Sequence, residues 1–202
     1  MKEELKKQKK INMEKIFNLI VNGVGGQGVI TLLTLIDEAA MADGYDIRSS
    51  ELHGLSQRGG SVQTHIRFGK KVNSPLIENG KADLVISLEM LEALRQTQIA
   101  GKQTKFLINE FFLPLQGAAI SREEVESQLA TLKNEKHIVP ADQICKEKLQ
   151  NEVVSSTFLF GYAVAQNLIP ISKEAALKAI EKFPQKYIEL NRNAFNLGYE
   201  NK

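Results

Sequence analysis

The sequence of 202 residues contains a single cysteine, Cys145, and no long apolar run. One thiol cannot form an intramolecular disulfide, and it cannot by itself hold an iron–sulfur cluster or a structural zinc ion. The longest apolar stretches fall far short of the ~20 residues needed to cross a bilayer. The lysine-rich start has no apolar segment of a secretory leader behind it. These absences predict a reduced, cytoplasmic chain without a membrane partner and without a cluster of its own.

Aromatic residues are also few, and the positive charge of the chain is confined to its start. Only 13 residues are Phe or Tyr, and none of them interleaves with a basic run. Residues 1–15 carry six lysines against three glutamates, whereas the rest of the chain has 20 basic and 21 acidic residues. A nucleic-acid-binding domain needs a basic patch on its folded part. We therefore expect no nucleic-acid partner, and we interpret residues 1–13 as a flexible, solvated extension.

Short apolar runs of the kind that form buried strands alternate with segments of helical length and composition. Strands are expected at residues 16–22, 45–51, 61–68, 83–88, 104–109 and 137–140. The helices between them are expected at residues 29–41, from the end of the strand at 83–88 to residue 94, and at 122–134. From residue 142 onward only helices are expected: a strongly apolar one within 153–166, one from 172 to about 183, and a last segment from 184.

This alternation, with its short connections, predicts one α/β domain over residues 14–200. We expect an open, mostly parallel sheet flanked by helices in a Rossmann-like three-layer arrangement, followed by an all-helical C-terminal region. Ser121 and Glu124 have the spacing of a capping box, which predicts a helix start at residue 122. The sequence has no linker long enough to divide it into two domains.

The motif GVGGQG follows the first predicted strand and precedes the first predicted helix. Glycines at this position permit a tight turn and close approach of a ligand to the backbone, and free amides at the positive end of a helix attract a phosphate. The alternative is that the glycines only let the helix pack closely against the sheet or a partner subunit. The candidate binding residues of the motif are Gly23, Gly25, Gly26, Gln27 and Gly28.

A second group of functional side chains lies between the second and third predicted strands, in the segment SELHGLSQRGGS. Because the carboxyl ends of parallel strands meet at one edge of a sheet, we expect this loop to lie beside the glycine turn. Arg58 suits a phosphate or carboxylate, but it could instead form a structural pair with Glu51. His53 is a candidate acid or base, with a hydrogen-bonding surface residue as the alternative. Further candidate binding residues in this segment are Ser56, Gln57, Gly59 and Gly60.

The sequence has no recognised set of catalytic or metal-binding residues. His53 and His65 are too far apart to share a helical turn, and no carboxylate pattern completes a metal site. No serine lies in a G-x-S-x-G elbow, and no Walker lysine follows Gly28. Cys145 lacks a CxxC partner, so we expect a packing or surface role for it. The chain alone presents a ligand cradle without an evident catalytic centre.

Three segments, in their order and spacing, resemble a known family. NLIVNGVGGQGVITL, SSELHGLSQRGGSVQTHIRFG and SPLIENGKADLVISLEMLEALR are similar to the gamma-type module of the 2-oxoacid:ferredoxin oxidoreductases, and within that family to its indolepyruvate branch. The resemblance covers about residues 14–200. Its E-x-HG-x-x-QRGG block is far more specific than the glycine turn.

The resemblance implies a small subunit of an enzyme that decarboxylates a 2-oxo acid, here an aryl pyruvate such as indolepyruvate. Such enzymes pass electrons through iron–sulfur clusters to ferredoxin and release an acyl-CoA. The resemblance places thiamine diphosphate, its magnesium ion and the clusters on a larger partner subunit, and makes ferredoxin an indirect partner. This chain has no cysteine set for clusters and no GDG…N segment for thiamine diphosphate. We therefore expect it to be inactive alone.

Three functions are compatible with these motifs. In the first, the small subunit helps to bind coenzyme A, with the amides of residues 25–28 on its diphosphate and Arg58 as the countercharge. In the second, the chain is a Rossmann-type module for NAD or FAD, with Glu51 on the ribose. In the third, it is a non-catalytic scaffold whose glycine loops pack against the partner subunit.

Overall fold

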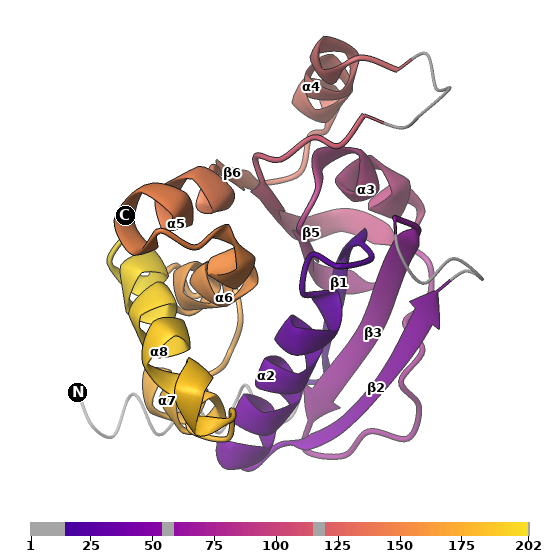
Figure 1. The fold of residues 1–202 in the computed structure, drawn as a ribbon. Coiled ribbons are helices and arrows are strands. Elements are labelled where there is room, and N and C mark those ends of the chain that lie inside the picture. The colour runs from indigo at the N-terminus through magenta and orange to yellow at the C-terminus, as the bar shows by residue number, and fades with distance from the viewer. Residues whose placement is uncertain (1–14, 54–58, 115–119, 202) are drawn as a thin grey trace.

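Six strands form one open sheet in the order β2-β3-β1-β4-β5-β6 (Figure 1). The computed structural model describes residues 15–53, 59–114 and 120–201. In chain order, the strands are β1 (Phe17–Val24), β2 (Asp46–His53), β3 (Ser61–Gly69), β4 (Ala82–Ser87), β5 (Ala100–Asn109) and β6 (Lys136–Val139).

The sheet is mixed, with a parallel part and an antiparallel part. β1, β4, β5 and β6 run parallel, whereas β3 lies antiparallel between β1 and β2. Only residues 54–60 connect β2 to β3, too few for the crossover that a parallel neighbour requires, so these two strands form a hairpin. The predicted open α/β sheet flanked by helices is confirmed, and this hairpin is its antiparallel part.

Helices cover both faces of the sheet (Figure 1). One face packs against α2, α5, α6, α7 and α8, and the other against α3 and α4. In chain order, the helices are α2 (Val29–Ala42), α3 (Met90–Arg95), the 3-10 turn η1 (Gln96–Gln98), α4 (Arg122–Thr131), α5 (Ala141–Leu149), the 3-10 turn η2 (Glu152–Val154), α6 (Ser155–Ala165), α7 (Lys173–Ile180) and α8 (Gln185–Glu200).

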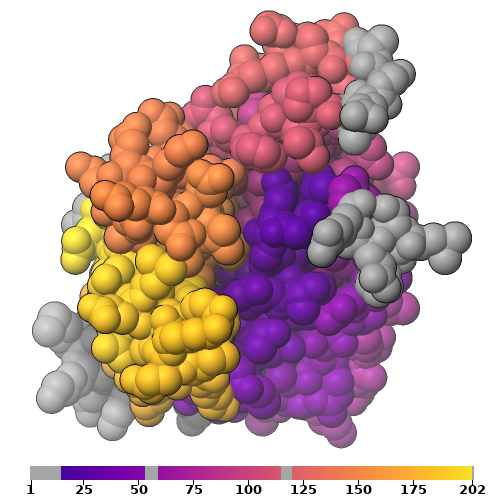
Figure 2. All heavy atoms as spheres, viewed as in Figure 1, coloured from indigo at the N-terminus to yellow at the C-terminus, as the bar shows by residue number. Residues whose placement is uncertain are grey.

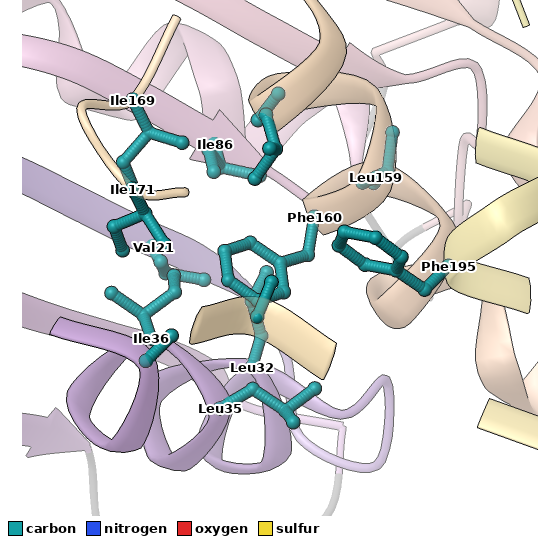
Figure 3. Packing of buried hydrophobic residues seen from close by; sticks show 14 of the residues in the cluster. Val21, Leu32, Leu35, Ile36, Ile86, Leu159, Phe160, Ile169, Ile171 and Phe195 are labelled. Carbon is teal, nitrogen blue, oxygen red and sulfur yellow. The ribbon is translucent and has the colours of Figure 1, made fainter. Parts of the chain in front are cut away.

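Side chains of β1 alternate between two apolar clusters, one on each face of the sheet. Leu19 and Val21 join the cluster around α2 and α6, whereas Ile20 joins the cluster around α3 and α4. Figure 3 shows the first cluster, in which side chains of β1, α2 and α6 meet. The sheet is thus buried on both sides, as the three-layer prediction requires.

Helix starts and ends follow local signals in most places. At the start of α4, Ser121 Oγ accepts from the N–H of Glu124 at 3.2 Å, and Glu124 Oε2 accepts from the N–H of Ser121 at 2.9 Å, which confirms the predicted capping box. The helix ends three residues earlier than expected, because Leu132 adopts an extended conformation. From Ala141 onward the described chain is helical, as predicted. No helix of the described residues is long and apolar enough to cross a membrane.

Helices α6 and α8 cross at a point where each has a glycine. A Cβ on Gly161 would run into the carbonyl oxygen of Phe195, and one on Gly198 into that of Phe158. Nine of the eleven residues of α6 are buried, so the helix has almost no solvent-facing side. The two glycines allow the backbones to approach closely and let α8 cover α6.

We expect Gly198→Ala to lower the free energy of unfolding by about 2–3 kcal/mol, because the new methyl group meets backbone atoms that cannot rotate away. Gly44→Ala is the comparison, since Gly44 is open to solvent and its positive φ adds only local backbone strain. Urea unfolding of both variants measures the difference. Equal stability of Gly198→Ala and the wild type would contradict the described crossing.

Candidate functional site

β1 ends in a tight turn that leads directly into α2. The N–H of Gln27 donates to the carbonyl of Val24 at 3.1 Å, and Gly26 and Gly28 adopt positive φ angles of 104° and 88°. Such angles suit glycine and strain other residues. A Cβ on Gly26 would meet no atom within 4 Å, whereas one on Gly28 would lie 3.0 Å from Ser156 Oγ. The turn is therefore open at Gly26 and packed against α6 at Gly28.

Two of the four amides predicted to hold a diphosphate are bonded inside the protein. Gly25 N–H donates to the carbonyl of Gly60 at 2.8 Å, and Gln27 N–H is used within the turn. The N–H groups of Gly26 and Gly28 have no hydrogen-bond partner among the described residues. No side chain of the described residues caps α2, so its first-turn N–H groups also lack acceptors there, and its positive end faces the turn. Gly26, Gly28 and the first turn of α2 can therefore donate to an anion.

Gln27 supports the turn from within. Its Oε1 accepts a hydrogen bond from Val24 N–H at 2.7 Å. A Cβ on Gly23 would lie 2.8 Å from this oxygen and 3.0 Å from the Cβ of Leu88, which follows β4. Gly23 is thus required for packing, and the Gln27 side chain holds the end of β1.

The β2–β3 hairpin brings the second predicted segment to the glycine turn. His53, Val62 and Gly23 lie opposite one another on β2, β3 and β1, so β2 ends and β3 begins at the edge of the sheet where the turn lies. β2 shares the direction of β1, as expected, although β3 lies between them. The hydrogen bond from Gly25 to Gly60 joins the two segments directly.

The other predicted residues of this segment are placed only in part. Gly59 adopts a positive φ of 72°, and a Cβ there would meet nothing within 4 Å. The backbone of His53 ends β2. Three predicted binding residues lie outside the described residues, and their roles stay predictions: Ser56, Gln57 and Arg58.

Glu51 lies away from the glycine turn, on the face of the sheet that α2 covers. β3 separates it from β1, a distance of two strand spacings or about 10 Å. Ser49, on the same face of β2, donates from Oγ to Asp37 Oδ2 of α2 at 2.6 Å. Burial, helped by the charges of Glu38 and Glu51 and opposed by that hydrogen bond, raises the pKa of Asp37 to about 6. Asp37 Oδ1 is buried without a partner among the described residues.

Buried polar side chains, which the sequence analysis did not identify, lie at or near the carboxyl ends of β1, β4 and β5. Ser87 Oγ donates to Asn22 Oδ1 at 2.5 Å, and Asn22 Nδ2 donates to the carbonyl of Glu92 at 2.6 Å. Asn109 Nδ2 donates to Asp142 Oδ1 at 2.9 Å. These bonds attach the sheet edge to α3 and α5. In the sequence, the only local sign of these side chains is a polar residue at the end of each apolar run.

Two glutamates of the α3 region are used inside the protein. Ser61 Oγ donates to Glu92 Oε2 at 2.5 Å, which ties the start of β3 to α3, and Arg95 pairs with the other oxygen of Glu92 at 3.3 Å. The carboxylate of Glu89 accepts from the N–H groups of Glu92 and Leu113, while burial raises its pKa. Both carboxylates therefore fix the sheet edge.

Two hollows meet at the glycine turn. The edge hollow, of about 370 Å³, lies at the carboxyl ends of β1 and β5 beside α5. The α8 groove, of about 480 Å³, lies between the starts of α2 and α6 and the first half of α8. Gly26 and Val153 line both. Figure 2 shows the face on which they open, between the indigo turn with α2 and the orange and yellow helices α5 to α8.

The two hollows differ in their lining. The polar residues that line the edge hollow are Gln27, Asn109, Asp142, Gln143, Lys146, Glu152 and Ser155. The α8 groove has apolar walls that include two aromatic rings, and a floor of hydroxyl and amide groups, formed by Phe183, Tyr187, Leu190, Ser156, Thr157 and Asn191.

The site is equipped for binding. Cys145 is fully buried, and burial raises the pKa of its thiol to about 12, with Asp142 adding to the effect. The thiol is therefore protonated and not nucleophilic at neutral pH. The described residues contain no group of three or more His, Cys, Asp or Glu that could hold a metal ion. Unpaired amides, a helix end and two hollows can bind and orient an anionic ligand.

Comparisons with known proteins agree with this architecture. The family model for pyruvate ferredoxin/flavodoxin oxidoreductase matches residues 18–201. A curated relative, "Indolepyruvate oxidoreductase subunit IorB" of Archaeoglobus fulgidus, is 35% identical over 192 residues, which cover 90% of this chain and 93% of the relative.

Two solved structures share the fold. The gamma subunit of a keto/oxoacid ferredoxin oxidoreductase from Geobacter sulfurreducens superposes with a TM-score of 0.71 at 23% identity, covering 91% of this chain and 96% of the other. A 2-oxoglutarate:ferredoxin oxidoreductase from Magnetococcus marinus, solved with 2-oxoglutarate, coenzyme A and succinyl-CoA bound, has a TM-score of 0.71 at 18% identity. The match covers 92% of this chain and 30% of that one.

Asp37→Asn is expected to stabilise the protein at neutral pH. The folded pKa of about 6 lies above the ordinary value of 3.8, so the stability that protonated Asp37 contributes is complete below pH 4 and is lost as pH rises to about 6. At pH 7.5 the free energy of unfolding of the variant should exceed that of the wild type by about 1–2 kcal/mol, after allowance for partial solvent exposure of Asp37. At pH 4 the two should be equal. Unfolding by denaturant at both pH values measures this.

Asp46→Asn is the control for that experiment. Asp46 is an exposed carboxylate whose pKa is lowered by its hydrogen bond from Val72 N–H, with a further contribution from Arg48. Its substitution should stabilise the protein at neither pH. A gain for Asp37→Asn that is equal at pH 4 and pH 7.5 would contradict the described burial.

Proposed function

The chain belongs to the pyruvate ferredoxin/flavodoxin oxidoreductase family, and we propose that, as the small subunit of a 2-oxoacid:ferredoxin oxidoreductase, it binds the diphosphate of coenzyme A at the glycine turn. The observation that carries this proposal is the pair of amides at Gly26 and Gly28, which have no hydrogen-bond partner among the described residues and lie at the positive end of α2 on the lining of the α8 groove. An anion placed there would meet several converging N–H donors.

The overall reaction consumes a 2-oxo acid and the thiol of coenzyme A, releases carbon dioxide and an acyl thioester, and passes an electron pair to ferredoxin. Thiamine diphosphate, bound by a larger partner subunit, would supply the decarboxylation chemistry. The residues of this chain would hold the acyl acceptor. Gly26 and Gly28 donate to its diphosphate, Gly23 and Gln27 keep the turn in shape, and Arg58 supplies a countercharge.

Indolepyruvate or a similar aryl pyruvate is the 2-oxo acid that we propose. The support is the similarity to the Archaeoglobus fulgidus protein, whose name includes that substrate. The aryl group would be recognised mainly by the partner subunit, because the proposed role of this chain concerns coenzyme A.

One observation favours the scaffold alternative in part. The bond from Gly25 N–H to the carbonyl of Gly60 uses one predicted phosphate donor to join the two glycine segments. A dinucleotide site has less support, because β3 places Glu51 away from the turn and on the face under α2. The assay below separates coenzyme A binding from a scaffold role.

Gly26→Asp, assayed in the reconstituted complex, should raise the KM for coenzyme A about tenfold or more, because a carboxylate would face the diphosphate at close range. The kcat at saturating coenzyme A should change little. Gly26→Ala separates backbone strain from charge and should have a smaller effect. Gly80→Asp, at another glycine with positive φ and open surroundings but remote from the turn, should behave like the wild type. An assembled Gly26→Asp complex with unchanged KM favours the scaffold function.

A further inference from the structure

The α8 groove is a second binding surface that continues from the glycine turn. It shares Gly26 with the edge hollow, so a ligand held by its middle at Gly26 has space on both sides. A volume of about 480 Å³ is within the range of small-molecule sites, about 300–1,000 Å³. The groove therefore has the size and the position to take one half of a two-ended molecule.

The floor of the groove contains a polar group that the protein itself does not use. Ser156 is 1% exposed, and its hydroxyl has no hydrogen-bond partner among the described residues. Its Oγ lies 3.0 Å from the position of a Cβ on Gly28, so the missing side chain of Gly28 leaves the hydroxyl open toward the groove. Because Ser156 lines the groove, its hydroxyl can form a hydrogen bond with a ligand held there.

The walls of the groove suit a flat aromatic group. Phe183, Leu190 and the ring of Tyr187, which is 46% exposed, form one side. Bases stack readily on such rings. Lys186 Nζ lies 4.7 Å from the ring centroid of Tyr187 and makes no ion pair with any described residue. A cation next to an aromatic ring of the groove suits a base that carries a phosphate on its sugar.

We propose that the α8 groove binds the adenosine half of coenzyme A, with adenine beside Tyr187, the 3′-phosphate near Lys186 and the diphosphate at Gly26. This inference rests on the proposed function. The pantetheine half then leaves across the edge hollow. That direction follows from the chemistry, because its thiol must reach an acyl group formed on the partner subunit, whereas the adenosine half can stay on this chain.

The test uses a side chain that fills the groove without touching the core. Thr31 is exposed on α2 and lines only the α8 groove. Side chains on a helix lean toward its N-terminus, so the indole of Thr31→Trp would fill the groove that Thr31 lines. Thr34→Trp is the matched control, since Thr34 is also exposed on α2, one turn further from the glycine turn.

Binding is measured on the assembled complex by calorimetry, with coenzyme A, adenosine 3′,5′-bisphosphate and 4′-phosphopantetheine as separate probes. Thr31→Trp should weaken the binding of coenzyme A about tenfold or more and abolish the binding of the bisphosphate. The affinity for 4′-phosphopantetheine should not change. Tyr187→Ala should weaken coenzyme A and the bisphosphate severalfold, and Tyr187→Phe should restore both. Thr34→Trp should match the wild type.

Other results overturn the inference in distinct ways. If Thr31→Trp weakens the binding of 4′-phosphopantetheine and leaves the binding of the bisphosphate unchanged, the groove binds the opposite half of coenzyme A. If Thr31→Trp leaves all three probes unchanged while Gly26→Asp weakens coenzyme A, the groove is not used and the proposed function stands. If Gly26→Asp also leaves coenzyme A unchanged, the proposed function itself fails.

Discussion

The burial of α6 determines where the other elements of the α2 face lie. Nine of its eleven residues are buried, and a helix that is buried on nearly all sides must be covered by other elements. α2, α5, α7 and α8 provide that cover. The close crossing at Gly161 and Gly198 brings α8 against α6, and the first half of α8 therefore lies beside the start of α2. Both hollows at the glycine turn are consequences of this packing.

The hairpin of β2 and β3 imposes a second constraint, on the sheet edge. By inserting β3 next to β1, it moves the end of β2 away from the glycine turn, but it brings Gly60 close enough to bond Gly25. The bond from Ser61 to Glu92 then fixes the start of β3 to α3. The turn is consequently held from two sides, and its remaining free amides keep a fixed direction. Such preorganisation lowers the entropy cost of binding an anion.

Much of this architecture could be predicted from the sequence, because short apolar runs and glycine punctuation report local structure directly. The strand–turn–helix unit around Gly26 and the capping box at Ser121 are examples. The insertion of β3 between β1 and β2 could not be predicted in the same way, because strand order depends on packing between segments distant in sequence. The same applies to the α8 groove, since Ser156 and Tyr187 carry no motif. The buried amides of Asn22 and Asn109 had a local signal, a polar residue at the end of an apolar run, but their partners are set by the tertiary structure.

The two interpretations of the GVGGQG motif, ligand binding and close packing, apply to different glycines within it. A Cβ on Gly23 or Gly28 would press against Gln27, Leu88 or Ser156, whereas one on Gly26 would meet nothing. Packing alone therefore accounts for glycine at positions 23 and 28 and does not account for it at position 26. The φ of 104° at Gly26 requires glycine for backbone reasons, and its N–H, which has no hydrogen-bond partner among the described residues, lies where two hollows meet. A turn that served only to pack α2 on the sheet would have no need of that open position, so the proposed anion site includes Gly26, whereas Gly23 serves the packing of the turn.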